Sequence, residues 1–106
     1  MGEYVQVLTA TDSEEQAKAL ARGLVEARLA GCVQVVGPVT SVYRWEGQVE
    51  EAREWLCVAK TRKALYERVE AFIRERHTYE VPEIIAVPIS SGSESYLAWL
   101  DAATAG

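Results

Sequence analysis

The chain has 106 residues, of which 49% are apolar and 25% charged. This is the size and composition of one globular domain, residues 1–106, and it excludes collagen, a disordered tail and a coiled coil. The formal net charge of −5, with no basic cluster, argues against nucleic acid and anionic membranes, because both require cationic side chains. We therefore expect small molecules, cations or other proteins as partners.

The two cysteines indicate the compartment. Cys32 and Cys57 show no CxxC spacing, and the N-terminus shows no signal-peptide pattern. No apolar run approaches the roughly 20 residues that a membrane helix requires. Isolated thiols in such a chain indicate a reducing environment, so we expect a cytoplasmic protein.

The N-terminal part of the chain predicts a strand followed by a helix. Residues 3–10 are rich in β-forming side chains. Ser13 and Gln16 have the spacing of a capping box, which starts a helix. Gly31 is expected to end that helix as its C-cap.

The central part predicts a hairpin that projects from the domain. Residues 32–36 and 39–45 are expected to be strands, broken or bent by Gly37-Pro38. Glu46-Gly47 is a plausible two-residue turn. In the return strand, 48–60, the first half is polar on both faces and the second half is apolar on both faces. The apolar half therefore predicts a central strand, and the polar half an arm that rests on a neighbouring subunit.

The C-terminal part predicts a helix, a strand and a last short helix. The helix is expected at 62–77 with Thr61 as cap, and the strand at 83–89, with Pro88 favouring an edge position. Ser93 is expected to cap the last helix. The order β-α-β-β-α-β matches a ferredoxin-like α+β fold, with an antiparallel sheet, an extra C-terminal helix and a projecting hairpin arm.

His77 is the only histidine and the first candidate for chemistry. At the C-terminus of a helix the macrodipole favours its protonated form. It is either a metal ligand or proton carrier, or a residue that ends the helix by satisfying a carbonyl. The polar and aromatic segment after it, which includes Tyr79 and Glu83, favours a loop site.

Three further candidate side chains belong to the predicted hairpin. Glu54 and Lys60 flank the buried half of strand 48–60, so they can form a polar site with His77 or Glu83. Trp45 belongs to the arm and is either an interface anchor or packed within the chain.

No standard catalytic or cofactor motif is present, including GxGxxG, the P-loop, GxSxG and HExxH. Cys32 and Cys57 are expected to behave as small buried hydrophobes, because no sequence neighbour favours a reactive thiolate. An enzyme that uses Cys32 or His77 is the least supported hypothesis, and we expect no enzymatic activity.

Five segments, in order and covering nearly the whole chain, resemble the CutA family of divalent-cation-tolerance proteins. They are 41–47 (SVYRWEG), Glu54, Lys60-Thr61, 77–84 (HTYEVPEI) and 96–100 (YLAWL). The resemblance implies a tightly packed homotrimer whose arms reach onto neighbours, similar in build to PII signalling proteins. It also implies a non-enzymatic role in tolerance of copper and other divalent cations.

The resemblance also bears on the metal. Some metal-binding members carry Cys at the position of Leu8 and a second His at that of Arg76, so only His77 of that set is present. Cu(II) prefers several nitrogen and oxygen donors, and we therefore expect weak binding of Cu(II) or another divalent cation, with His77 as ligand.

The alternative is a PII-like small-molecule sensor with its site in the cleft between subunits. Its predicted ligand cleft consists of Trp45, Glu54, Lys60, His77, Tyr79 and Glu83.

Overall fold

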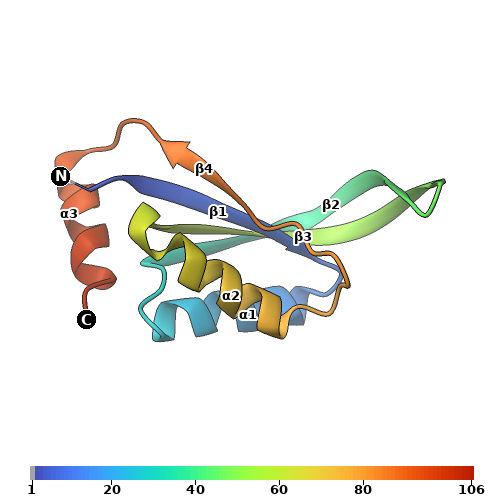
Figure 1. Cartoon of the computed structure of the whole chain (residues 1–106), viewed down its shortest axis with the longest axis horizontal. Helices are drawn as coiled ribbons and strands as arrows, with labels where there is room; N and C mark the ends of the chain where they lie inside the picture. The colour runs from blue at the N-terminus through green and yellow to red at the C-terminus, as the bar shows by residue number, and fades with distance from the viewer. Residues whose placement is uncertain (1) are drawn as a thin grey trace.

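The structure, a computed structural model, describes residues 2–106, which form one four-stranded sheet and three α-helices (Figure 1). The elements are β1 (Tyr4–Thr11), α1 (Glu14–Glu26), β2 (Cys32–Trp45), β3 (Gln48–Arg62), a 3₁₀ turn (Lys63–Leu65), α2 (Tyr66–Arg76), β4 (Ile85–Ile89) and α3 (Glu94–Ala103). The strand order is β2-β3-β1-β4, and every neighbouring pair is antiparallel. The predicted ferredoxin-like fold with an extra C-terminal helix is confirmed.

The core lies between one face of the sheet and the helices α1 and α2 (Figure 1). Side chains alternate between the faces of a strand, so one set of β1 and β3 residues meets the helices. The main buried apolar cluster consists of Val5, Val7, Leu24, Leu29, Ala30, Ala59, Leu65, Val69 and Ile73. The predicted caps of α1 and α3 are confirmed, because Ser13 Oγ and Ser93 Oγ accept the amide protons of Gln16 and Tyr96.

The hairpin of β2 and β3 projects beyond the helices as the predicted arm (Figure 1). It contributes to a longest dimension of 45 Å, against 25 and 22 Å for the other two. Trp45 pairs with Gln48, so Glu46 and Gly47 form a two-residue turn. Their φ angles of 51° and 80° are those that a hairpin turn of this length requires.

Of the two effects predicted for Gly37-Pro38, the bend is confirmed and the break is wrong, since β2 runs through this pair. The pairing with β3 shifts register between Val36 and Val39, which bends the strand without ending it. Glycine is required here because a Cβ on Gly37 would lie 2.5 Å from Cδ1 of Trp55. The bend therefore lets the Trp55 indole lie against the backbone.

The predicted end of the first helix is also wrong. α1 ends at Glu26, and the chain reverses at Arg28, whose φ is 60°. The amide protons of Leu29 and Ala30 are donated to the Leu24 carbonyl, which satisfies the helix terminus. Gly31 is already joined to the sheet, because its amide proton is donated to the Lys60 carbonyl.

The second helix and the last strand begin later than predicted. Thr61 remains in β3, where its hydroxyl donates to the Leu29 carbonyl, and a 3₁₀ turn leads to the start of α2 at Tyr66. The last strand begins at Ile85, not at residue 83. Its predicted edge position is confirmed, and Pro88 occupies this edge strand.

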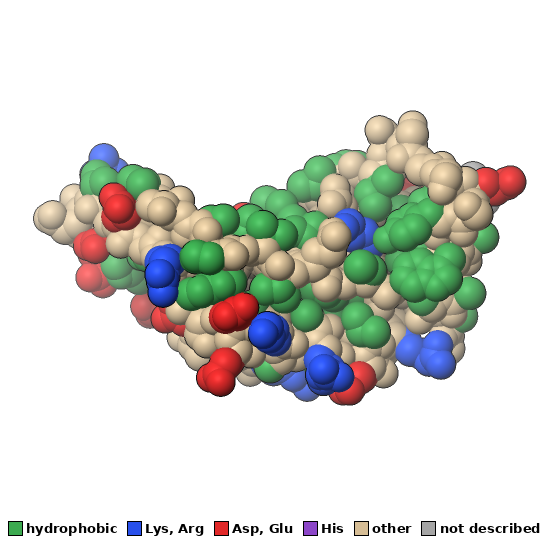
Figure 2. All heavy atoms as spheres, turned by 180° about the vertical axis from the view of Figure 1, so that it is seen from behind, with side chains coloured by type: hydrophobic (Ala, Val, Ile, Leu, Met, Phe, Trp, Pro, Cys, Tyr) green, Lys and Arg blue, Asp and Glu red, His purple; other side chains and the backbone are tan. Residues whose placement is uncertain are grey.

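The other face of the sheet carries no helix of the described chain along most of its length. Large apolar side chains are exposed on this open face, and α3 adds two aromatic residues beside it. They include Val36 (46% exposed), Ile85 (46%), Val87 (39%), Tyr96 (39%) and Trp99 (47%). Figure 2 shows hydrophobic side chains spread over the surface between the arm and α3.

None of the helices in residues 2–106 has the length and apolarity needed to cross a membrane.

Candidate functional site

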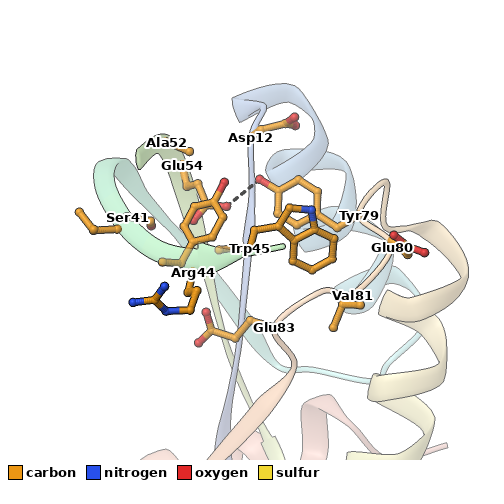
Figure 3. A pocket seen from close by; sticks show the side chains of 13 residues that line it. Asp12, Ser41, Arg44, Trp45, Ala52, Glu54, Tyr79, Glu80, Val81 and Glu83 are labelled. Atoms are coloured by element: carbon orange, nitrogen blue, oxygen red, sulfur yellow. Dashed lines mark hydrogen bonds between the residues drawn. The ribbon is translucent and has the colours of Figure 1, made fainter. Parts of the chain in front are cut away.

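A pocket of about 810 Å³ lies at the root of the arm (Figure 3). Its walls come from β2 and β3 of the arm, from the C-terminal end of β1, and from the loop between α2 and β4. The lining residues are Ala10, Asp12, Ser41, Val42, Tyr43, Arg44, Trp45, Ala52, Glu54, Tyr79, Glu80, Val81 and Glu83. The pocket therefore joins segments that are far apart in the sequence.

Glu54 and Tyr79 form the polar centre of this pocket (Figure 3). The Tyr79 hydroxyl donates a 2.6 Å hydrogen bond to Oε2 of Glu54. The Glu54 side chain lies in β3 and is only 7% exposed. Desolvation, together with the hydrogen bond to Glu54 and its charge, raises the pKa of Tyr79 well above 10, so the phenol stays a donor at neutral pH.

His77 holds the loop that carries Tyr79. Its Nε2 lies 2.8 Å from the Ala10 carbonyl oxygen, and its Nδ1 accepts the amide proton of Tyr79 at 3.1 Å. A carbonyl only accepts, so the proton is on Nε2 and Nδ1 is the acceptor. The imidazole also packs against the Tyr79 ring, with 4.7 Å between centroids. Both ring nitrogens are therefore used to hold the backbone after α2 against the end of β1.

The structure brings together most of the predicted cleft. Trp45, Glu54, Tyr79 and Glu83 line the pocket, and His77 lies behind Tyr79 and supports it.

Lys60 lies elsewhere within the chain. It is six residues beyond Glu54 on β3, or about 20 Å along a strand. Its ammonium group donates to the Gln34 side chain on the open face of the sheet. A role for Lys60 at the pocket therefore requires a second copy of the chain.

Several lining residues were missed by the sequence analysis. Asp12 was hidden because an acidic residue before a helix has an ordinary role at the helix N-terminus. Tyr43 and Arg44 adjoin Trp45 in a recognised motif, and Glu80 adjoins Tyr79, but the sequence does not show which strand face each one occupies.

The pocket is acidic. Asp12, Glu54, Glu80 and Glu83 line it together with one cation, Arg44, which gives a formal charge of −3 at pH 7. Among residues 2–106, no salt bridge involves any of these five side chains. The described lining residues therefore leave the pocket with a net negative charge, which favours a positively charged ligand over an anion.

The possible metal donors of the described residues are not gathered at one point. In residues 2–106, no group of three or more His, Cys, Asp or Glu side chains is arranged to hold a metal ion. The His77 imidazole can ligate a metal only by giving up one of its two hydrogen bonds.

The cysteines do not offer a nucleophile at the pocket. Both thiols are free, and Cys57 is buried in the core, where its Sγ lies 3.4 Å from the Ala17 carbonyl. Burial raises the pKa of the Cys57 thiol to about 11, so the reactive thiolate is scarce at neutral pH.

The fold and the pocket define a small ferredoxin-like α+β protein with a hairpin arm and an acidic, aromatic pocket at its root. Comparison with known families identifies it further. The model of the CutA1 divalent ion tolerance protein family matches residues 5–103. The chain belongs to this family.

Two relatives and one solved structure illustrate the similarity. The divalent-cation tolerance protein CutA of Thermus thermophilus is 45% identical over 94 residues, covering 89% of this chain and 91% of the relative. The chloroplastic protein CutA of Arabidopsis thaliana is 41% identical over 100 residues, covering 94% of this chain but 55% of the relative. The structure of the periplasmic divalent cation tolerance protein CutA from Archaeoglobus fulgidus has a TM-score of 0.94 and 32% identity, covering 96% of this chain and 99% of that one.

The family name describes tolerance of divalent ions and no catalysed reaction. The chain spans about half the length of the plant relative, so activities and partners of that longer protein are not transferred.

Proposed function

We propose that the chain is a non-enzymatic homotrimer that acts in tolerance of divalent metal ions, copper in particular, and that binds the metal weakly. The observation that carries this proposal is the uncovered apolar face of the sheet. Val36, Ile85 and Val87 are 39–46% exposed on this face, and monomeric proteins seldom expose a large contiguous apolar patch. A second copy of the same face, with arms reaching across, is the covering that the family resemblance implies.

Metal binding is proposed to be shared between subunits. His77 and Glu83 supply two donors in one chain, and a carboxylate of a neighbour supplies another. Coordination by His77 removes a hydrogen bond worth about 0.5–1.5 kcal/mol, which keeps the affinity low. The free thiols Cys32 and Cys57 support a reducing cytoplasm as the location.

Light scattering and calorimetry test this function. We expect the mass of a trimer at micromolar concentration, and a stable monomer would refute the assembly. We also expect Cu(II) to bind the wild type measurably and His77→Ala more weakly. Equal binding by the two proteins would remove His77 from the metal site.

The second candidate is a PII-like small-molecule sensor. The observation in its favour is the pocket of about 810 Å³, a size typical of small-ligand sites, with aromatic walls and a buried carboxylate. A thermal-shift screen of metabolites tests it, because a ligand that binds only the native state raises the melting temperature. A screen in which no metabolite raises the melting temperature would count against it.

A further inference from the structure

We infer that the hairpin arm is held at a fixed angle to the domain by contacts on both faces of β3, which set its direction before a neighbouring copy binds. These contacts, which we call the clamp, are the Trp55 indole on one face and the hydrogen bond between Glu54 and Tyr79 on the other. The angle is a property of the single chain, and only its use by a neighbouring copy rests on the proposed homotrimer. A preset arm favours assembly, because ordering a flexible segment opposes association.

The first observation is that β3 loses a neighbour and bends at the same point. β1 pairs with β3 only as far as Trp55, so in the described sheet residues 48–54 pair with β2 alone. Two residues of β2, Gly37 and Pro38, lie there opposite the single residue Trp55, which is a β-bulge. We call this point the hinge. An isolated two-stranded ribbon is marginally stable, so the arm that leaves the sheet here (Figure 1) needs further contacts to keep one direction.

Trp55 fixes the hinge from the side of the helices. Its indole packs against the buried cluster of Ala17, Leu20 and Cys57, which belong to α1 and β3. The same indole lies against the bulge, since a Cβ on Gly37 would be 2.5 Å from Cδ1 of Trp55. One rigid side chain therefore joins the hinge to the core of the domain.

Glu54 fixes the hinge from the other side, because adjacent side chains of a strand point to opposite faces. The residue is only 7% exposed, and its Oε2 accepts the 2.6 Å hydrogen bond from the Tyr79 hydroxyl (Figure 3). His77 holds Tyr79 in turn, because it accepts the Tyr79 amide proton and donates to the Ala10 carbonyl of β1. These contacts tie the base of the arm to the strand with which β3 has just ceased to pair.

The alternative is an arm that swings freely until a neighbouring copy sets its direction. A freely swinging arm does not require contacts on both faces of its hinge. In this chain, two consecutive residues of β3, Trp55 and Glu54, are held from opposite faces by different parts of the domain. The contacts therefore favour a direction that is set within the chain.

Pulsed electron paramagnetic resonance measures the direction of the arm in the intact chain. Spin labels are attached at two exposed positions, through Gln48→Cys near the tip of the arm and Arg22→Cys on α1. Cys32→Ala removes the half-buried thiol, and Cys57 is buried and stays unlabelled. Refolding with an excess of unlabelled chain leaves one labelled copy in each assembly.

The decisive comparison is between the wild-type arm in the assembled and in the dissociated protein. Val87→Glu places a charge on the open face to dissociate the copies, and Ile85→Glu is added if Val87→Glu alone keeps the wild-type mass. We expect one narrow distance distribution in the assembled protein and the same distribution in the dissociated one. A distribution that is broad in the dissociated chain and narrows only on assembly would overturn the inference, because the neighbour would then set the arm.

Substitutions in the dissociated background test the contacts of the clamp. Glu54→Ala removes the acceptor of the Tyr79 hydroxyl and should widen the distance distribution and shift its centre. Glu54→Gln keeps an acceptor and should retain the narrow distribution, which distinguishes the hydrogen bond from a general loss of stability. If Glu54→Ala does not fold, Tyr79→Phe removes the same hydrogen bond. Tyr66→Phe is the matched control, since its hydroxyl donates to the Ile84 carbonyl away from the hinge, and it should leave the distribution unchanged.

The other face of the hinge is tested by Trp55→Leu, which should also widen the distribution. An unchanged distribution in both Trp55→Leu and the folded variant that lacks the Glu54–Tyr79 hydrogen bond would overturn the clamp. Light scattering measures the mass of the wild type separately. A monomeric wild type with a narrow distribution would refute the proposed homotrimer and support the clamp, so the two failures are distinguishable.

Discussion

Replacing Tyr79 by Phe tests whether the Tyr79–Glu54 pair stabilises the pocket. The substitution removes the phenol hydroxyl, which donates to Glu54 Oε2 at 2.6 Å, and leaves the ring that packs on His77. It therefore leaves the carboxylate of Glu54, a residue that is only 7% exposed, without its side-chain donor. The fold and the loop are otherwise unchanged, which makes the free energy of unfolding the natural readout.

The magnitude follows from the charge on the acceptor. A hydrogen bond to a charged group contributes about 1.5–3 kcal/mol, against about 0.5–1.5 kcal/mol for a neutral pair. We expect Tyr79→Phe to lower the free energy of unfolding by about 2 kcal/mol in the wild type. In a Glu54→Gln background the acceptor is neutral, so the same substitution should cost about half as much. The double-mutant cycle should then give a coupling of about 1 kcal/mol.

Denaturation by guanidinium chloride, followed by circular dichroism, supplies these values. The protomer concentration is held constant, because an oligomer's stability depends on it. Tyr66→Phe is the matched control, since the Tyr66 hydroxyl donates to the neutral Ile84 carbonyl at 3.3 Å. We expect the control to lose less stability than Tyr79→Phe. A loss at Tyr79 that equals the control and is unchanged by Glu54→Gln would refute the reasoning.

The pH dependence of the free energy of unfolding gives an independent check on the hydrogen bond between Tyr79 and Glu54. Desolvation and the hydrogen bond to Glu54 raise the pKa of Tyr79 in the native state, while an unfolded tyrosine titrates near 10. Above about pH 10 the unfolded chain releases a proton that the native chain retains, so this contribution to stability falls as pH rises. It is fully present below pH 10. The destabilisation caused by Tyr79→Phe should therefore shrink above pH 10.

Three further substitutions test other parts of the structure. His77→Ala removes both hydrogen bonds of the imidazole and should lower the free energy of unfolding by about 1–3 kcal/mol. The Tyr79 amide should then exchange its proton faster because the loop is loosened, and an unchanged exchange rate would contradict this role of His77. Gly37→Ala places a Cβ 2.5 Å from the Trp55 indole and should cost about 1–3 kcal/mol in chemical denaturation, whereas a neutral effect would show that the indole can move. Val87→Glu, on the open face, should reduce the mass in light scattering to that of a monomer, and Val25→Glu, exposed on α1, should not. An unchanged mass for Val87→Glu would exclude the open face as the interface.

The order of elements could be predicted from the sequence because local signals and hydrophobic periodicity agree along most of the chain. Ser13 and Ser93 cap their helices as expected. The boundaries failed where tertiary contacts override local preference. Gly31 resembles a C-cap, but the chain already reverses at Arg28 and Gly31 joins β3 through the Lys60 carbonyl. Thr61 resembles an N-cap, but its hydroxyl donates a hydrogen bond to the Leu29 carbonyl instead.

The site could be predicted only in part, for the same physical reason. Motif residues such as Trp45, Glu54 and Tyr79 do converge on the pocket, because the hairpin and the loop before β4 meet at the root of the arm. Lys60 could not be placed relative to the pocket from the motifs. Their spacing in the sequence does not say that the residues between Glu54 and Lys60 form one extended strand, which separates the two side chains. The double hydrogen bonding of His77 could not be foreseen, since its partners are the backbone of β1 and of the following loop.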